Sequence, residues 1–324
     1  MVLLKQTDYV FSSAYLRAIE NKLLTKNDFE SLILASDFDA CAKILRDKGF
    51  SDSDITPENL DLVLQNKLNS CRQEAIWSSP DKNVLDIFSY KNDFHNLKAV
   101  IKALSVKKND YARYFLKPYT QDPEIFVKAI AEIDFSILPQ GFKSCAKDAF
   151  YAHNKSGDPA LAECIIDKAS MDYVLRAAEA TENDFLIGLI RLENTLSDIK
   201  IAARCAYCKK DTEFIKKALS ENSDIDRQEL ILASVSGKLT DYLKAKGMDL
   251  AANAINLSLG EFEKYADTLI CEYIEDSSKI TFGLETVIAY IYRVESQIKT
   301  VRVILNAKNN KLSESKIRQR VRIM

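Results

Sequence analysis

One cysteine pair has a spacing that could bind a metal or carry out redox chemistry. Cys205 and Cys208 are separated by two residues, as in one half of a zinc site. A zinc site needs four ligands, and the next cysteine, Cys271, lies 63 residues further along the chain. The pair also falls in an amphipathic helical pattern, where a free cysteine packs as a small hydrophobic residue. We therefore favour a structural role and expect no metal ligand here.

The other residues that commonly catalyse reactions form no recognisable site. His95 and His153 are the two histidines, and neither lies in an HExxH pattern or near a cysteine pair. The phosphate-binding patterns GxxxxGK[ST] and GxGxxG do not occur among the eight glycines. Carboxylate pairs such as Asp52 and Asp54 lie in turn-like stretches, which favours helix caps over a general acid and base. We expect no catalytic or cofactor-binding residue.

A short charged ladder is the remaining candidate. Glu295, Lys299 and Arg302 lie about one helical turn apart, beside an apolar stripe. Three roles are open: a buried ionic latch, a stripe that docks a partner, or ordinary solvated charge. Spacing alone favours solvated charge, because exposed ion pairs contribute only about 0–1 kcal/mol and are common.

The elements that carry these residues repeat at intervals of about 99 residues. Residues 32–36 (LILAS) return as residues 230–234, and residues 45–49 (LRDKG) return as 243–247 (LKAKG), both 198 residues apart. A middle copy is indicated by an apolar residue followed by lysine inside an amphipathic helix, here called the marker helix: Leu97-Lys98, Ile199-Lys200 and Ile298-Lys299. We expect three copies, residues 1–106, 107–210 and 211–324. Repetition on this scale is typical of a scaffold.

Local signals predict where several helices begin and end. Three proline pairs have the residues of helix N-termini: Thr56-Pro57, Asp122-Pro123 and Asp158-Pro159. Gly49 and Gly247 follow apolar-periodic stretches, as left-handed C-terminal caps do.

The third marker helix is predicted over residues 284–307, about 36 Å at 1.5 Å per residue. Residues 312–320 are similar to residues 219–228 and predict the first helix of a shortened fourth copy. Such a helix would cover the edge of the third copy.

Composition predicts an all-α fold. The chain has 324 residues, of which 47% are hydrophobic and 28% charged, and its eight glycines and six prolines are few for a strand-rich fold. A net charge of −2 argues against a general nucleic-acid binder. The end of the chain differs, because residues 299–322 hold eight basic residues and one acid, Glu314. This basic tail could meet acidic protein or lipid headgroups, or be solvated.

The sequence also predicts the cellular compartment of the protein. No apolar run approaches the length of a membrane span, and the N-terminus lacks a signal-peptide pattern. Seven cysteines, an odd number scattered through helical patterns, predict reduced thiols and no disulfide. We expect a soluble cytoplasmic protein.

Residues 282–305 closely resemble the C-terminal signature of the C subunit of prokaryotic V/A-type rotary ATPases, a family related to the d subunit of eukaryotic vacuolar ATPases. The matching residues are Gly283, Glu285, Ala289, Tyr290, Glu295, Ile298, Lys299, Arg302, Ile304 and Leu305. The N-terminal helix around Tyr15 and residues 93–98 (DFHNLK) are also similar. Thr286 stands where proline is usual, residues 306–308 (NAK) where a Gly-Lys pair is common, and residues 107–210 match only in length and pattern.

The resemblance implies an all-α fold of three similar helical subdomains in a pseudo-threefold funnel. It implies a non-catalytic central-stalk protein that joins the shaft, made of the D and F subunits, to the proteolipid (c/K) rotor ring. The stator (a/I) is a further candidate partner. Cofactors, nucleic acid and small-molecule substrates are not implied, and the protein would lie peripherally on the cytoplasmic face of the membrane. The signature residues would have structural or interface roles: Gly283, Glu285, Tyr290, Glu295, Lys299 and Arg302.

Two alternatives come from other classes of protein. A generic helical-repeat adaptor would show the same repeat without the C-terminal signature. A redox or small-molecule enzyme would be centred on Cys205 and Cys208. The transported ion, proton or sodium, and the direction of ATP turnover stay open.

Overall fold

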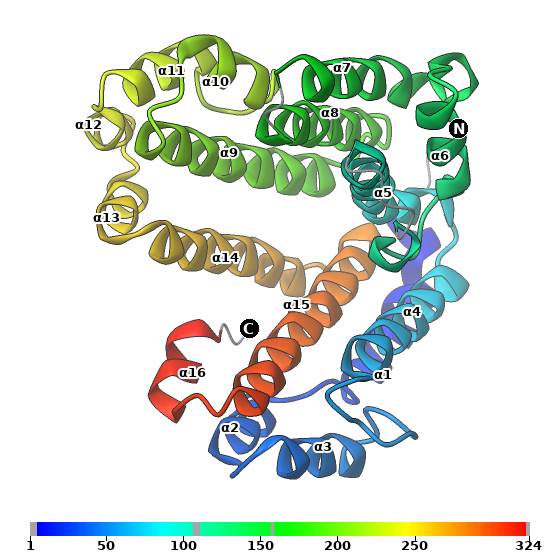
Figure 1. Cartoon of the computed structure of the whole chain (residues 1–324). Coiled ribbons are helices and arrows are strands. Elements are labelled where there is room, and N and C mark those ends of the chain that lie inside the picture. The colour runs from blue at the N-terminus through cyan, green and yellow to red at the C-terminus, as the bar shows by residue number, and fades with distance from the viewer. Residues whose placement is uncertain (1–4, 106–110, 157–158, 322–324) are drawn as a thin grey trace. The chain divides into compact units, whose positions relative to one another are not determined.

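The computed structural model describes residues 5–105, 111–156 and 159–321. Over these residues the regular secondary structure is helical and includes no strand (Figure 1), which confirms the predicted all-α class. The helices form two compact units, Asn83–Ile270 and a unit that combines Met1–Lys82 with Cys271–Met324. The second of these, here called the terminal unit, therefore brings the two ends of the sequence together. The other is called the central unit.

The terminal unit is built around one long helix, α15 (Leu284–Asn309). Other helices of the unit pack against α15: α1 (Val10–Glu20), α2 (Lys26–Leu34), α3 (Phe38–Asp47), α4 (Leu60–Ser78) and α16 (Glu314–Arg320). Short 3-10 helices, Gln6–Tyr9 and Ser277–Lys279, complete it. Every side chain from Leu284 to Ile291 is buried, so the first two turns of α15 are covered on all sides. An apolar stripe predicted only one covered face, and tertiary packing extends it.

The central unit holds two hydrophobic cores, each around one marker helix. Phe94 of α5 (Ile87–Ser105) packs with α6 (Pro123–Ala131), α7 (Gln140–Ser156) and α8 (Pro159–Glu179). Ile199 of α9 (Asp184–Tyr207) packs in the second core. That core also contains residues of α10 (Thr212–Ala218), α11 (Arg227–Val235), α12 (Leu239–Ala245), α13 (Asp249–Leu257) and α14 (Leu259–Asp276). Short 3-10 helices are Asn83–Asp86, Ala112–Tyr114 and Phe135–Ile137. The boundaries of the three sequence copies stay a prediction.

The predicted helix ends are largely confirmed. Gly49 and Gly247 adopt φ of +66° and +77°, the left-handed conformation that favours glycine. The next amide bonds back to Leu45 O at 2.9 Å after α3, and to Leu243 O at 2.8 Å after α12. Both helices therefore close with the same C-terminal cap.

The predicted proline starts differ in outcome. For the third, α8 begins at Pro159, and Asp158 lies outside the described residues. Asp122 caps α6 as expected, with its carboxylate accepting a backbone hydrogen bond inside the helix. The start at Pro57 is wrong, because α4 begins at Leu60. Thr56 and Asn59 instead exchange side-chain to backbone hydrogen bonds at 2.8 and 3.4 Å, which makes a turn before the helix.

Candidate functional site on the third marker helix

The start of α15 requires glycine. Gly283 has φ +154°, and a Cβ atom there would lie 2.0 Å from Oε2 of the buried Glu285. Thr286 donates to Gly283 O at 2.8 Å and shares a 2.7 Å hydrogen bond with Ser13 of α1. The first turn of α15 is thus fixed both to its own cap and to α1.

Tyr290 is a core residue with a polar end. Its side chain is buried, and its hydroxyl donates to Glu74 Oε2 on α4 at 3.4 Å. Burial, and then the neighbouring Cys71, raise the pKa of Tyr290. Burial also raises the pKa of the Cys71 thiol. Both groups stay protonated near neutral pH, so neither is suited to act as a base or nucleophile there.

The residues of the charged ladder differ in role: one forms a buried ion pair and the other two are at least partly exposed to solvent. Glu295 pairs with Arg72 of α4 at 2.5 Å, and both side chains are largely buried, as in an ionic latch. Arg302 pairs with the exposed Asp61 of α4 at 3.0 Å. Lys299 is exposed, and its side chain has no ion pair or hydrogen bond to any described residue.

A polar side chain just before the apolar-lysine pair holds a loop in place. Gln297 of α15 accepts from Leu24 N at 3.0 Å and donates to Leu24 O at 3.1 Å. Asn96 of α5 makes the same two contacts with Leu116, at 2.8 and 3.1 Å. Each side-chain amide bonds both the N–H and the C=O of one loop residue, as another stretch of backbone would. The loop therefore cannot move without breaking both hydrogen bonds.

The second marker helix has a related contact. Asp198 of α9 accepts from Ser220 N at 2.9 Å. Asn96 lies in residues 93–98, which resemble the family, but the sequence patterns did not single out Asp198 or Gln297. Their common place in the repeat was the available signal.

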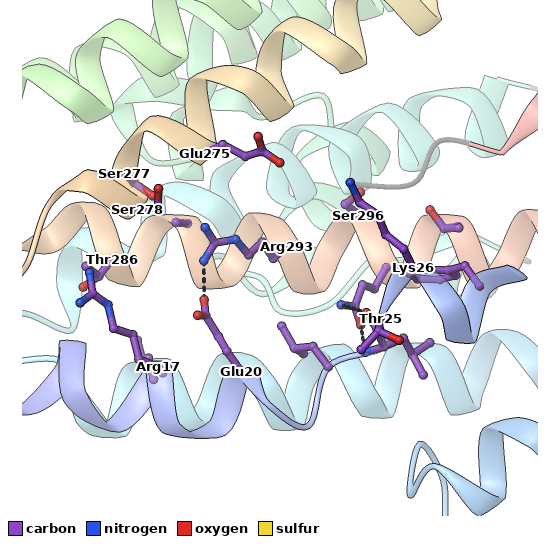
Figure 2. A pocket seen from close by; sticks show the side chains of 17 residues that line it. Arg17, Glu20, Thr25, Lys26, Glu275, Ser277, Ser278, Thr286, Arg293 and Ser296 are labelled. Atoms are coloured by element: carbon purple, nitrogen blue, oxygen red, sulfur yellow. Dashed lines mark hydrogen bonds and ion pairs between the residues drawn. The ribbon is translucent and has the colours of Figure 1, made fainter.

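A groove of about 500 Å³ with a mixed polar and apolar lining runs along α15 within the terminal unit (Figure 2). Glu20 of α1 and Arg293 of α15 meet across it at 2.6 Å, and Arg17 donates to Ile280 O at 2.5 Å. Among the described residues, its lining includes neither histidine nor cysteine. The lining residues are Leu16, Arg17, Glu20, Leu23, Leu24, Thr25, Lys26, Phe29, Glu275, Ser277, Ser278, Thr286, Ala289, Arg293, Ser296, Gln297 and Thr300.

The described part of the basic tail packs onto α2. Arg318 donates to both carboxylate oxygens of Glu30, at 3.0 and 2.8 Å. Ile317 of α16 is fully buried. Lys308 Nζ donates to Ile33 O at 2.7 Å, near the end of α2. Two basic residues of this tail, Lys308 and Arg318, therefore bond to α2, while its last basic residue, Arg322, lies outside the described residues.

The cysteine pair and the histidines lie elsewhere. Cys205 is buried in α9, and Cys208 is exposed at the cap of that helix. All seven cysteines are free thiols. His95 Nε2 lies 3.2 Å from Tyr114 O, and His153 is on α7. No group of three or more metal-ligating side chains occurs in the part of the chain that the structure describes.

Comparison with known proteins decides the family. Residues 12–320 match the model of the family described as ATP synthase (C/AC39) subunit. The chain belongs to this family. One relative is the C subunit of the V-type sodium ATPase of Enterococcus hirae, which is 20% identical over 316 residues, with 95% of this chain and 96% of that protein covered.

Membership in the C/AC39 family confirms the resemblance seen at the C-terminus. All six signature residues lie in the matched span, on α15 or directly before it. No helix of the described residues is both long and apolar enough to cross a bilayer. The chain is thus a V-type ATPase C subunit by family, and its α15 is the helix on which the signature lies.

Proposed function

We propose that this protein is a non-catalytic coupling element of the central stalk in a V/A-type rotary ATPase. It would join the D and F shaft to the proteolipid rotor ring, so that ATP turnover is coupled to proton or sodium translocation. The family match over nearly the whole chain supports this proposal, as does the relative's name. The protein would act at the cytoplasmic face of the membrane, with the stator as a further contact.

The observation that carries the proposal is the way α15 is held. A coupling element has to transmit torque without yielding, which requires dense packing and fixed contacts along its length. Along α15, Thr286 bonds Ser13, Glu295 pairs with Arg72, and Lys308 bonds the end of α2. The helix is therefore fixed at its start, its middle and its end.

The loop contacts support a cyclic arrangement of the copies. The helix α5 holds Leu116, which leads into α6, and α9 holds Ser220, which leads into α11. The helix α15 holds Leu24, which leads into α2. Each marker helix thus holds a segment within the next copy, and the last holds one within the first. The threefold funnel that the resemblance implies stays part of the proposal.

Lys299 is the signature residue best suited to contact a partner. Within the terminal unit, Gly283 allows the start of α15, while Tyr290 and Glu295 make buried polar contacts. Arg302 forms an ion pair. Glu285 is buried. Lys299 alone among the six is exposed and lacks a side-chain bond to the described residues, so packing does not account for it.

A binding experiment tests both levels of the proposal. The full chain should bind the D and F shaft and the rotor ring in detergent. Lys299→Glu should weaken one of these interactions without changing thermal stability. Lys43→Glu, a charge reversal at another exposed lysine, should leave both unchanged. Failure of the unaltered chain to bind either partner would contradict the proposed function and favour a different adaptor role.

A further inference from the structure

A buried carboxylate on α9 stands where the other marker helices carry amides. Asn96, Asp198 and Gln297 each directly precede the apolar-lysine pair. The two amides each accept a hydrogen bond from a backbone N–H and donate one to the C=O of the same residue. An ionised carboxylate can only accept, whereas a protonated carboxyl group can also donate. Asp198 shows the accepting half of this pattern, from Ser220 N, and could supply a donor only if it carried a proton.

A second carboxylate holds the same segment. Asp198 is 1% exposed and accepts from Ser220 N at 2.9 Å. The Ser220 hydroxyl donates to Asp172 Oδ1 of α8 at 3.0 Å, and Glu221 N donates to the same oxygen at 3.2 Å. The Asp172 carboxylate, which shares Ser220 with Asp198, disfavours the ionised form of Asp198.

We propose that Asp198 is a proton-sensitive latch for residues 219–226, the segment between α10 and α11. With a proton, Asp198 keeps the hydrogen bond from Ser220 N without placing a second charge in this buried site. Without the proton, a buried negative charge lies beside Asp172, and opening the segment to water relieves it, so the segment opens more often. The latch belongs to the free chain and does not depend on the proposed coupling role.

The surrounding charges act in both directions. From α8, Asp172 favours the protonated form, while Lys168 is paired with Glu221 at 2.5 Å. From α11, Arg227 favours the ionised form. On α10, Lys216 and Glu213 form an exposed pair at 3.0 Å.

Burial is the largest effect on Asp198. It raises the pKa of Asp198 to about 6, although the hydrogen bonds from Ser220 and Ser223 act to lower this pKa. A group whose pKa is raised by folding contributes stability that is complete below its unfolded pKa and lost as pH rises through the folded value. For Asp198 this window runs from the ordinary value of 3.8 to about 6. The latch should therefore be firmer at pH 5 than at pH 7.5.

Hydrogen exchange of the purified full chain tests the latch. After correction for intrinsic rates, protection of residues 219–226 should be about tenfold lower at pH 7.5 than at pH 5.0, from the linkage of a single proton. Asp198→Asn should remove this pH dependence and keep the segment protected at both values. Equal protection of the unaltered chain at both values would overturn the proposal, as would pH dependence that persists in Asp198→Asn.

The first copy provides the matched test. Asn96→Asp places a carboxyl group against Leu116, so the segment around Leu116 should become better protected at pH 5.0 than at pH 7.5. The unaltered chain is the reference for this segment, because Asp93 and His95 also contact it, and burial raises the pKa of Asp93 and lowers that of His95. If Asp198→Asn failed to fold, Asn96→Asp would decide alone, and pH dependence equal to that of the unaltered chain in this variant would overturn the proposal.

Discussion

Arg72 of α4 and Glu295 of α15 form an ion pair of 2.5 Å in which the arginine side chain is 10% exposed. The Nε and Nη1 atoms of Arg72 are buried and make no hydrogen bond to the described residues. The charge of Arg72 therefore depends on Glu295 for its compensation. Because a buried charge without a partner is costly, this pair is more sensitive to the loss of one member than to the loss of both.

Replacing Glu295 should accordingly destabilise the terminal unit. Glu295→Gln should lower the free energy of unfolding by about 2–3 kcal/mol, somewhat below the cost for a fully buried pair. Urea denaturation measures this. Lys299→Gln, one turn away and exposed, should change it by less than about 0.5 kcal/mol. Equal effects of the two changes would show that the Glu295 pair is not a latch. The double variant Arg72→Met, Glu295→Leu should recover most of the loss.

Gly283 should not tolerate a side chain. Gly283→Ala should cost about 1–3 kcal/mol, because φ +154° is open mainly to glycine and the new Cβ atom would meet Glu285. Gly260→Ala is the matched control. Gly260 lies in α14, and a Cβ atom there would meet only Ser258 Oγ at 3.6 Å, so alanine should stabilise that helix. Thermal melts of the two variants should therefore shift in opposite directions.

The contact of α16 with α2 should depend on the opposite charges of Arg318 and Glu30. Arg318→Glu removes both hydrogen bonds to Glu30 and places two carboxylates together. Limited proteolysis should then cut α16 faster than in the unaltered chain. Adding Glu30→Arg restores opposite charges and should slow cleavage again. If the double variant were cut as fast as the single one, the ion pair would not be what holds α16.

Ile133 offers a stabilising substitution. It follows α6 with φ +54°, a conformation that is unfavourable for a β-branched residue, and its side chain is exposed. By comparison, the residue with a left-handed φ after α11 is a glycine, Gly237, with φ +70°. Ile133→Gly should raise the free energy of unfolding by about 1 kcal/mol. Unchanged or lower stability in denaturant titration would contradict the strain at this position.

The sequence patterns predicted the helices better than their partners. The third marker helix was expected over residues 284–307 and ends at Asn309, and the helix expected over 312–320 begins at Glu314. Periodicity identifies which face of a helix is apolar but not which segment covers it. Gln297 and Leu24 are 273 residues apart, and nothing local in the sequence joins them. The terminal unit could therefore not be predicted from helix patterns alone.

The sequence named the signature residues as candidates, but it could not predict their contacts. The ladder spacing of Glu295, Lys299 and Arg302 is the same whether the charges are buried or exposed. Their roles depend on Arg72 and Asp61, which come from α4 more than 220 residues earlier. The repeat did contain a signal for Asn96, Asp198 and Gln297, because all three precede an apolar-lysine pair.

The central claim, that this protein couples the shaft to the ring, is tested most directly by ATP-driven ion uptake into vesicles. The vesicles would contain the ATPase head, shaft, stator and ring, with or without this protein. We predict that ATP is hydrolysed without ion uptake when the protein is absent, and that adding the full chain restores uptake. Equal uptake per ATP in both preparations would contradict the claim.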